Sequence, residues 1–220
     1  MINLEKFKHK SWLDGRIIAI NADCQEVMAE IKDKEIDLCL TDPPYGININ
    51  HNMGRRKGCK SSDYAKVEWD DKPMSAALFN EIFRISKNQI IWGANHFINR
   101  MPLNSPCWLV WDKQFSEDVS FAQLEMAWTS YDKTCKKFVK HPAQQDRIHP
   151  TQKPLELFNW CLLKNSQEND LIFDGFLGSG TTAIACIKTN RRFIGCELDP
   201  IYFEKACERI DTELKQLTLF

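Results

Sequence analysis

Short apolar runs alternate along this chain with segments in which apolar residues recur at helical spacing. The apolar runs predict buried strands at 16–20, 36–41, 88–93, 107–113, 124–130, 170–174 and 192–197. The helical spacing predicts helices at 24–33, 75–87, 154–166, 181–189 and 200–214. This order is typical of an α/β fold with one doubly wound, mostly parallel sheet that carries helices on both faces.

The composition adds a setting to this fold. With 220 residues and an ordinary share of apolar and charged side chains, we expect a single domain that covers residues 1–220. The nine cysteines are odd in number and form no C-x-x-C pair, which favours a reducing compartment over a disulfide framework or a zinc site. No apolar run approaches the length of a membrane span, and no signal core is present, so we expect a cytoplasmic protein without a membrane partner.

The net charge of -1 gives no overall attraction to polyanions, so such contacts would need local patches. Segments 48–72 and 131–153 have little pattern, and each holds a basic cluster. Taken alone, either cluster is more simply explained as solvated loop charge. The clusters consist of Arg55, Arg56, Lys57 and Lys60, and of Lys133, Lys136, Lys137 and Lys140.

Ligands of open parallel sheets bind beyond the carboxyl ends of the strands. In "FDGFLGSGTT" (173–182), Asp174 closes a strand, and Gly178 and Gly180 allow a tight turn into the next helix. Glu197 ends the following strand, where a nucleoside-binding fold places a carboxylate on the ribose hydroxyls. The spacing is neither that of a dinucleotide site nor that of a P-loop, which favours a nucleoside without phosphates. A purely structural glycine turn is the alternative.

A second strand ends in "TDPPYG" (41–46). Pro43 and Pro44 stiffen the backbone and lack N–H groups, so their carbonyl oxygens stay free to accept hydrogen bonds. The Asp42 carboxylate, the Pro43 carbonyl and the Tyr45 ring could together receive a planar group that bears an exocyclic amine. A rigid turn without a ligand is the alternative.

Taken together, "TDPPYG", "FDGFLGSGTT" and "HPTQKPLELF" resemble the motifs of the S-adenosylmethionine-dependent DNA amino-methyltransferases, in the permuted β-type order. "NADCQEVM" (21–28) and "RRFIGCELDPIYFEKACERI" (191–210) are similar to the family's adenine-binding and ribose-binding segments. The resemblance implies a Rossmann-like methyltransferase fold, S-adenosylmethionine as cofactor, no metal, and double-stranded DNA as substrate. It also implies that segments 48–72 and about 112–148 contact DNA, the second as a target-recognition region.

The family's residue roles transfer to matching positions. Asp42 and the Pro43 carbonyl would accept hydrogen bonds from the target amine, Pro44 would stiffen the motif, and Tyr45 would stack on the flipped base. Glu197 would hold the ribose, Asp23 the adenine amino group and Lys153 the cofactor carboxylate. The other cofactor contacts would come from Cys24, Asp174, Phe176, Gly178, Ser179, Gly180 and Thr181.

The resemblance leaves the substrate open. Asp42 favours the N6 amine of adenine, because the family tends to carry Ser at this position when the target is the N4 amine of cytosine. RNA or a protein glutamine is a third substrate, although related enzymes then tend to carry Asn. Gly175 replaces the family's usual proline, so an inactive DNA-binding relative is also considered. A homodimer and a cognate restriction endonuclease are candidate partners.

Overall fold

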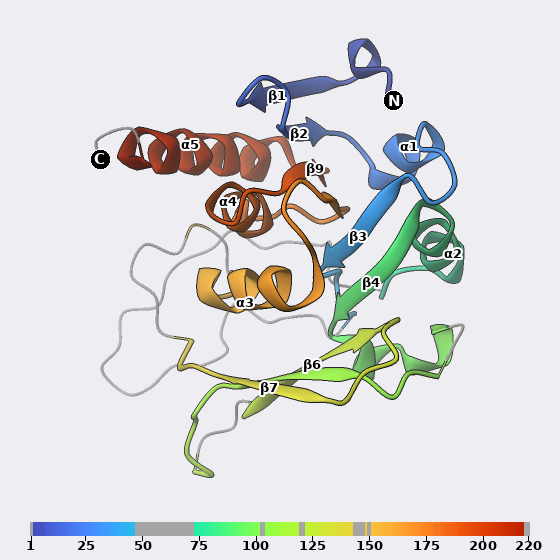
Figure 1. The fold of residues 1–220 in the computed structure, drawn as a ribbon, viewed down its shortest axis with the longest axis vertical. Helices are drawn as coiled ribbons and strands as arrows, with labels where there is room; N and C mark the ends of the chain where they lie inside the picture. The colour runs from blue at the N-terminus through green and yellow to red at the C-terminus, as the bar shows by residue number, and fades with distance from the viewer. Residues whose placement is uncertain are drawn as a thin grey trace.

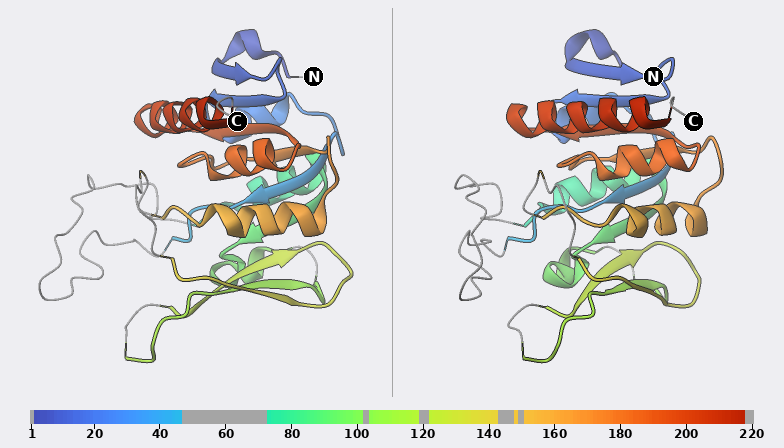
Figure 2. Two further views of the ribbon diagram at one scale, coloured as in Figure 1. Left: turned by 60° about the vertical axis from the view of Figure 1, so that its left-hand side comes forward. Right: turned by 90° about the vertical axis from the view of Figure 1, so that its left-hand side faces the viewer.

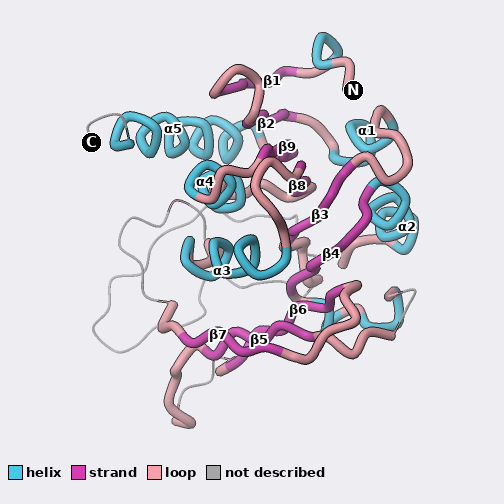
Figure 3. The backbone as a smooth tube through the Cα atoms, viewed as in Figure 1, coloured by secondary structure: helices cyan, strands magenta, loops and turns pink. Residues whose placement is uncertain are grey.

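The described strands form one nine-stranded sheet in the order β1-β2-β9-β8-β3-β4-β6-β5-β7. The computed structural model describes residues 2–46, 73–101, 104–118, 122–142, 148 and 151–217. Figures 1 and 3 show the sheet edge-on between two sets of helices. Its strands are β1 (Lys8–Trp12), β2 (Ile17–Asn21), β3 (Ile36–Thr41), β4 (Ser86–Trp92), β5 (Trp108–Asp112), β6 (Leu124–Thr129), β7 (Lys136–Val139), β8 (Leu171–Asp174) and β9 (Arg192–Glu197).

Helices cover both faces of this sheet. On one face α3, α4 and α5 run side by side, and on the other lie α1 and α2 (Figures 1 and 2). The helices are α1 (Cys24–Ala29), α2 (Ala76–Ile85), α3 (Leu155–Asn165), α4 (Thr181–Lys188) and α5 (Pro200–Leu217), with short 3-10 turns at Leu4–Lys6, Ala94–His96 and Ile98–Arg100. Within the described ranges, no helix is long and apolar enough to cross a bilayer.

The apolar core is divided by the sheet into two layers. One layer holds Leu157, Phe158 and Ile184 from the helices of the first face, and the other holds Met28 and Phe79 from α1 and α2. The central strands β3 and β8 are buried on both faces, which explains why the sequence shows them as continuous apolar runs. The expected α/β fold with one doubly wound, mostly parallel sheet is confirmed.

The order in which strands are added to the sheet reverses between β3 and β8. These two strands pair in parallel, with Leu38 beside Ile172. From β3 the chain continues to β4 on one side, and from β8 it continues to β9 on the other. Such a switch point leaves a crevice at the carboxyl ends of the two strands. Asp42 follows β3 and Asp174 ends β8, so the two predicted sites meet at this crevice.

Two strands were not expected from the sequence, and both are edges of the sheet. β7 lies inside segment 131–153, for which the sequence predicts little regular structure, and it pairs in parallel with β5. β1 pairs antiparallel with β2, and all its side chains except Trp12 are exposed. Neither strand has an apolar run or clean alternation, because an edge strand with a solvated face needs neither. The basic segment at 48–72 lies outside the described residues.

Candidate functional site

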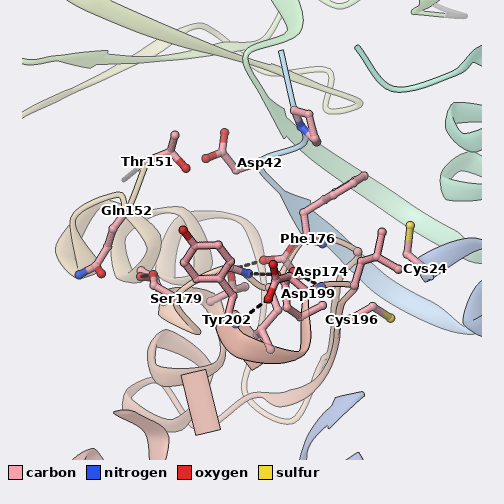
Figure 4. A pocket seen from close by; sticks show the side chains of 18 of the residues that line it. Cys24, Asp42, Thr151, Gln152, Asp174, Phe176, Ser179, Cys196, Asp199 and Tyr202 are labelled. Atoms are coloured by element: carbon pink, nitrogen blue, oxygen red, sulfur yellow. Dashed lines mark hydrogen bonds between the residues drawn. The ribbon is translucent and has the colours of Figure 1, made fainter. Parts of the chain in front are cut away.

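A cavity of about 520 Å³ opens at the carboxyl ends of β3 and β8. In the close-up of Figure 4, Cys24 and Cys196 lie at one end and Asp42 with Thr151 at the other, with Phe176 between them. The cavity thus connects the glycine-rich turn after β8 with the "TDPPYG" motif after β3. It falls within the size range of small-molecule sites in proteins.

Asp174 is buried at the centre of this crevice. Its carboxylate accepts hydrogen bonds from Thr41 Oγ1 at 2.7 Å, from Thr182 Oγ1 at 2.5 Å and from the Phe176 N–H at 3.0 Å. Burial raises the pKa of Asp174 to about 6, against the opposing effect of these three donors. Its hydrogen bonds fasten β3 and α4 to the turn, so Asp174 organises the crevice as well as lining it.

The glycine-rich turn is fixed to Glu197 at the end of β9. The Gly178 N–H donates to Glu197 Oε2 at 2.8 Å, and the Asp199 N–H donates to Oε1 at 2.9 Å. Gly178 has a φ of 52°, which favours glycine. Burial raises the pKa of Glu197, although both N–H donors oppose this. The carboxylate is therefore held in one orientation at the cavity wall.

Ser179 and Thr181 line the same wall and are tied to α5. The Arg209 guanidinium donates to the Ser179 carbonyl at 2.8 Å and to Thr181 Oγ1 at 2.9 Å. Gly180 is not among the residues that line the cavity. It faces α5 instead, since a Cβ at this position would lie 3.4 Å from the Ala206 Cβ. Its φ of 75°, in the left-handed region, is what favours glycine directly before α4.

Asp23 and Cys24 form the far end of the cavity. Asp23 caps α1 by accepting the Gln25 N–H at 2.9 Å. Burial raises the pKa of the Cys24 thiol to about 12, so this thiol is neutral at physiological pH. A neutral thiol beside apolar Phe176 makes this end of the cavity suited to a flat, uncharged ring.

The "TDPPYG" motif brings Asp42 and Tyr45 together at the other end. The Tyr45 hydroxyl donates to Asp42 Oδ1 at 2.6 Å. Its ring stacks on His96 with centroids 4.9 Å apart, and it lies so close to Gly93 that a Cβ there would be 1.9 Å from the Tyr45 ring. Gly93, with a φ of 71°, directly follows β4, and its lack of a Cβ makes room for the ring. Tyr45 is held by contacts from two strand ends.

Lys153 lies next to Asp42 and is only 5% exposed. Its ammonium is 2.5 Å from Asp42 Oδ2, 3.0 Å from the Tyr45 hydroxyl and 3.0 Å from Glu125 Oε2. Burial would lower the pKa of Lys153, but the two carboxylates raise it, so the side chain is a cation. For Asp42, burial raises the pKa and Lys153 opposes the shift.

Most of the predicted cofactor residues line this one cavity. The lining includes Asp23, Cys24, Lys153, Asp174, Phe176, Gly178, Ser179, Thr181 and Glu197, together with Asp42 and Pro44. Sequence reasoning missed Gln152, Asp199 and Tyr202, which also line it. Gln152 lies within "HPTQKPLELF", and Asp199 and Tyr202 lie within "RRFIGCELDPIYFEKACERI". Their nearness in sequence to predicted residues could have identified them.

The predicted DNA-binding residues fall into two groups. Arg55, Arg56, Lys57 and Lys60 lie outside the described residues. Of the second cluster, Lys136 and Lys137 belong to β7 and Lys133 lies over the Tyr131 ring at 4.5 Å. Lys137 pairs with Asp112 at 3.3 Å and Lys140 with Glu156 at 2.5 Å.

Comparisons with known proteins identify the class. M1.HpyAVI in complex with S-adenosylmethionine superposes with a TM-score of 0.58 at 21% identity, over 88% of this chain and 98% of that one. The cytosine-N4-specific PvuII DNA methyltransferase gives 0.61 at 13% identity, over 88% and 86%. The fold is therefore that of the S-adenosylmethionine-dependent methyltransferases.

The sequence comparisons refine this class. A family model described as DNA methylase (N6/N4) matches residues 101–208. The type II methyltransferase M2.MboI of Moraxella bovis is 27% identical, with 85% of each chain covered. These matches confirm the resemblance to the N6/N4 DNA amino-methyltransferases that the motifs indicate, and with it S-adenosylmethionine as the cofactor.

The charges that line the cavity fit this cofactor. Among the described residues that line it, five are carboxylates and Lys153 is the only lysine or arginine. S-adenosylmethionine carries a sulfonium, an ammonium and one carboxylate, and it has no phosphate. A wall of carboxylates with one ammonium group complements that pattern, whereas a phosphate would meet repulsion.

Proposed function

We propose that this protein methylates the N6 amine of adenine in double-stranded DNA. The observation that carries the proposal is the Asp42 carboxylate, which lies at one end of the cofactor cavity and accepts the Tyr45 hydroxyl at 2.6 Å. An acceptor and a flat ring on one stiff segment suit an aromatic amine. Their position at the cavity suits a methyl acceptor.

S-adenosylmethionine, when bound, supplies an electrophilic methyl group. The protein's task is to present the amine to it. The N6 amine is a poor nucleophile because its lone pair is delocalised into the ring. Acceptance of its two hydrogens by Asp42 and the Pro43 carbonyl would favour a tetrahedral nitrogen with a localised lone pair. Such positioning contributes up to roughly 7–11 kcal/mol to lowering a barrier.

Tyr45 would hold the base outside the duplex. Extruding a base costs a few kcal/mol, and stacking on an aromatic side chain returns about 1–3 kcal/mol. The phenol ring is already fixed by Asp42, His96 and Gly93. A ring that is ordered before the base arrives loses little entropy on stacking, which supports this role.

We further propose that Lys133, Lys136, Lys137 and Lys140, with the basic segment at 48–72, bind the phosphate backbone. Lys136 and Lys137 are exposed on the edge strand β7. The ion pairs of Lys137 and Lys140 are with partly exposed carboxylates and are weak enough to exchange for phosphates. DNA affinity should then fall steeply with salt.

The N4 amine of cytosine is the nearest alternative, since it is chemically similar and Asp42 could accept it in the same way. Asp at this position favours adenine, as the family tends to use Ser for cytosine. The two substrates give different products, so one experiment separates them.

The test is to incubate the protein with unmethylated DNA and S-adenosylmethionine, digest the DNA to nucleosides, and analyse them by mass spectrometry. The variant is Asp42→Ala, which removes the acceptor, and the control is Asp14→Asn, which neutralises an exposed carboxylate in the turn between β1 and β2. We expect N6-methyladenine from the wild type and the control, and none from Asp42→Ala, which should still bind the cofactor. If N4-methylcytosine is found instead, the same mechanism acts on cytosine and not on adenine. Cofactor binding without either product would refute the proposal and direct the search to RNA or protein.

A further inference from the structure

A chain of buried charges extends from Asp42 away from the cofactor cavity. Lys153 lies between Asp42 Oδ2, at 2.5 Å, and Glu125 Oε2, at 3.0 Å. The other oxygen of Glu125 pairs with Lys113. Both lysines and both carboxylates are largely buried, with side-chain exposures from 5% to 21%.

Glu125 enters this chain from a different part of the sheet than the motifs do. It lies on β6, two strands away from β3, and does not line the cavity. Burial alone would raise its pKa, but Lys153 and Lys113 lower the pKa of Glu125 to about 2. Glu125 is therefore a permanent anion whose contact with the site is made through Lys153.

Both oxygens of Asp42 already have donors. Oδ1 accepts the Tyr45 hydroxyl and Oδ2 accepts the Lys153 ammonium. Each carboxylate oxygen can accept a second hydrogen bond, so a target amine would share Asp42 with these donors, and Asp42 would hold it more strongly if Lys153 moved away. If Lys153 moved away from Asp42 with no other anion nearby, it would be an unpaired buried charge, which is strongly unfavourable.

Glu125 removes this difficulty because it already lies at ion-pairing distance from Lys153. We propose that Glu125 is a positioning residue, the counter-ion that keeps Lys153 paired while Asp42 accepts the target amine. This inference rests on the proposed function. It predicts that Glu125 affects the step that uses Asp42, and that it has little effect on filling the cofactor cavity.

Glu125→Gln in the full chain tests the inference, because it keeps the shape of the side chain and removes its charge. Lys153 is then left with Asp42 as its carboxylate and should hold it more tightly. We expect the single-turnover rate of DNA methylation, at saturating cofactor and DNA, to fall by about tenfold, within the range of couplings in one ion-pair network. The dissociation constant for S-adenosylmethionine, measured by calorimetry, should change by less than about twofold.

Two further variants make the result specific. Glu125→Asp keeps the charge and should restore most of the rate, whereas Glu208→Gln, on the exposed face of α5, should equal the wild type. An unchanged rate in Glu125→Gln would overturn the inference. Equal losses of rate and cofactor affinity, with a lower melting temperature in both Glu125 variants, would also overturn it, because they would show a purely structural role. A wild-type protein that methylates no DNA would refute the proposed function, and this inference with it.

Discussion

Replacing Asp174 by asparagine should make the folded protein more stable and the cofactor site weaker. Asp174 is 2% exposed, and its carboxylate accepts three hydrogen bonds that an asparagine can partly reproduce, since the hydroxyls of Thr41 and Thr182 can also accept. The change therefore removes a buried charge while leaving the shape and most of the hydrogen bonding in place.

The magnitude follows from the pKa of this carboxyl group. Burial raises the pKa of Asp174 from 3.8 to about 6 in the folded protein, so the folded state binds more protons than the unfolded state between these values. The free energy of unfolding therefore decreases as the pH rises from about 4 to about 6. Two pKa units correspond to about 3 kcal/mol, and this stability is fully present below pH 3.8 and absent at neutral pH.

Urea unfolding of the wild type and Asp174→Asn at pH 4, 5, 6 and 7.5 measures the effect. Contributions of the other carboxyl groups are common to both proteins and cancel in the difference. The variant should gain roughly 2 kcal/mol relative to the wild type between pH 4 and pH 7.5, because part of the change lies below pH 4. Two curves that stay parallel across this range would refute the reasoning. Calorimetry should show weaker cofactor binding by the variant, because a carboxylate facing a cationic ligand has been lost.

Two glycine substitutions test opposite expectations. Gly175→Ala should keep cofactor binding, because its added Cβ would meet Cys24 at an ordinary 3.4 Å. It should raise the free energy of unfolding by about 0.4–1 kcal/mol, because alanine has fewer conformations than glycine in the unfolded chain. Lost binding in calorimetry would contradict the first expectation. Gly93→Ala should lower the methylation rate by about tenfold or more with an unchanged cofactor dissociation constant, because its Cβ would displace the Tyr45 ring that completes the Asp42 site. A wild-type rate in Gly93→Ala would show that the position of this ring does not matter.

The sequence predicted the elements whose patterns arise from burial. β3 and β9 were expected at their observed bounds, because the middle of a strand covered on both faces must be apolar. β1 and β7 were not expected, because each is an edge strand with exposed side chains and therefore lacks an apolar run. Asp42 and Asp174 could be identified for the same reason that they meet, since each follows or ends a buried strand at the switch point.

The role of Glu125 could not be predicted in this way. It lies within the predicted strand at 124–130, and one charged residue in a strand is usually a solvated position. Its proposed role depends on Lys153, which lies 28 residues later in the sequence and reaches Glu125 only in the folded protein. Gly175 suggested an inactive relative, because the family usually carries proline there. In the structure, a Cβ added at Gly175 would meet its neighbours at ordinary contact distances.

The two edges of the sheet have a consequence for how copies of this chain can meet. Both outer strands are short and carry lysines: Lys8 and Lys10 on β1, and Lys136 and Lys137 on β7. Lysine-bearing, short edge strands discourage two sheets from joining into one, since like charges would be brought together along the new pairing. A dimer of this chain is therefore expected to use its helices or loops, and its sheet should resist growth into larger aggregates.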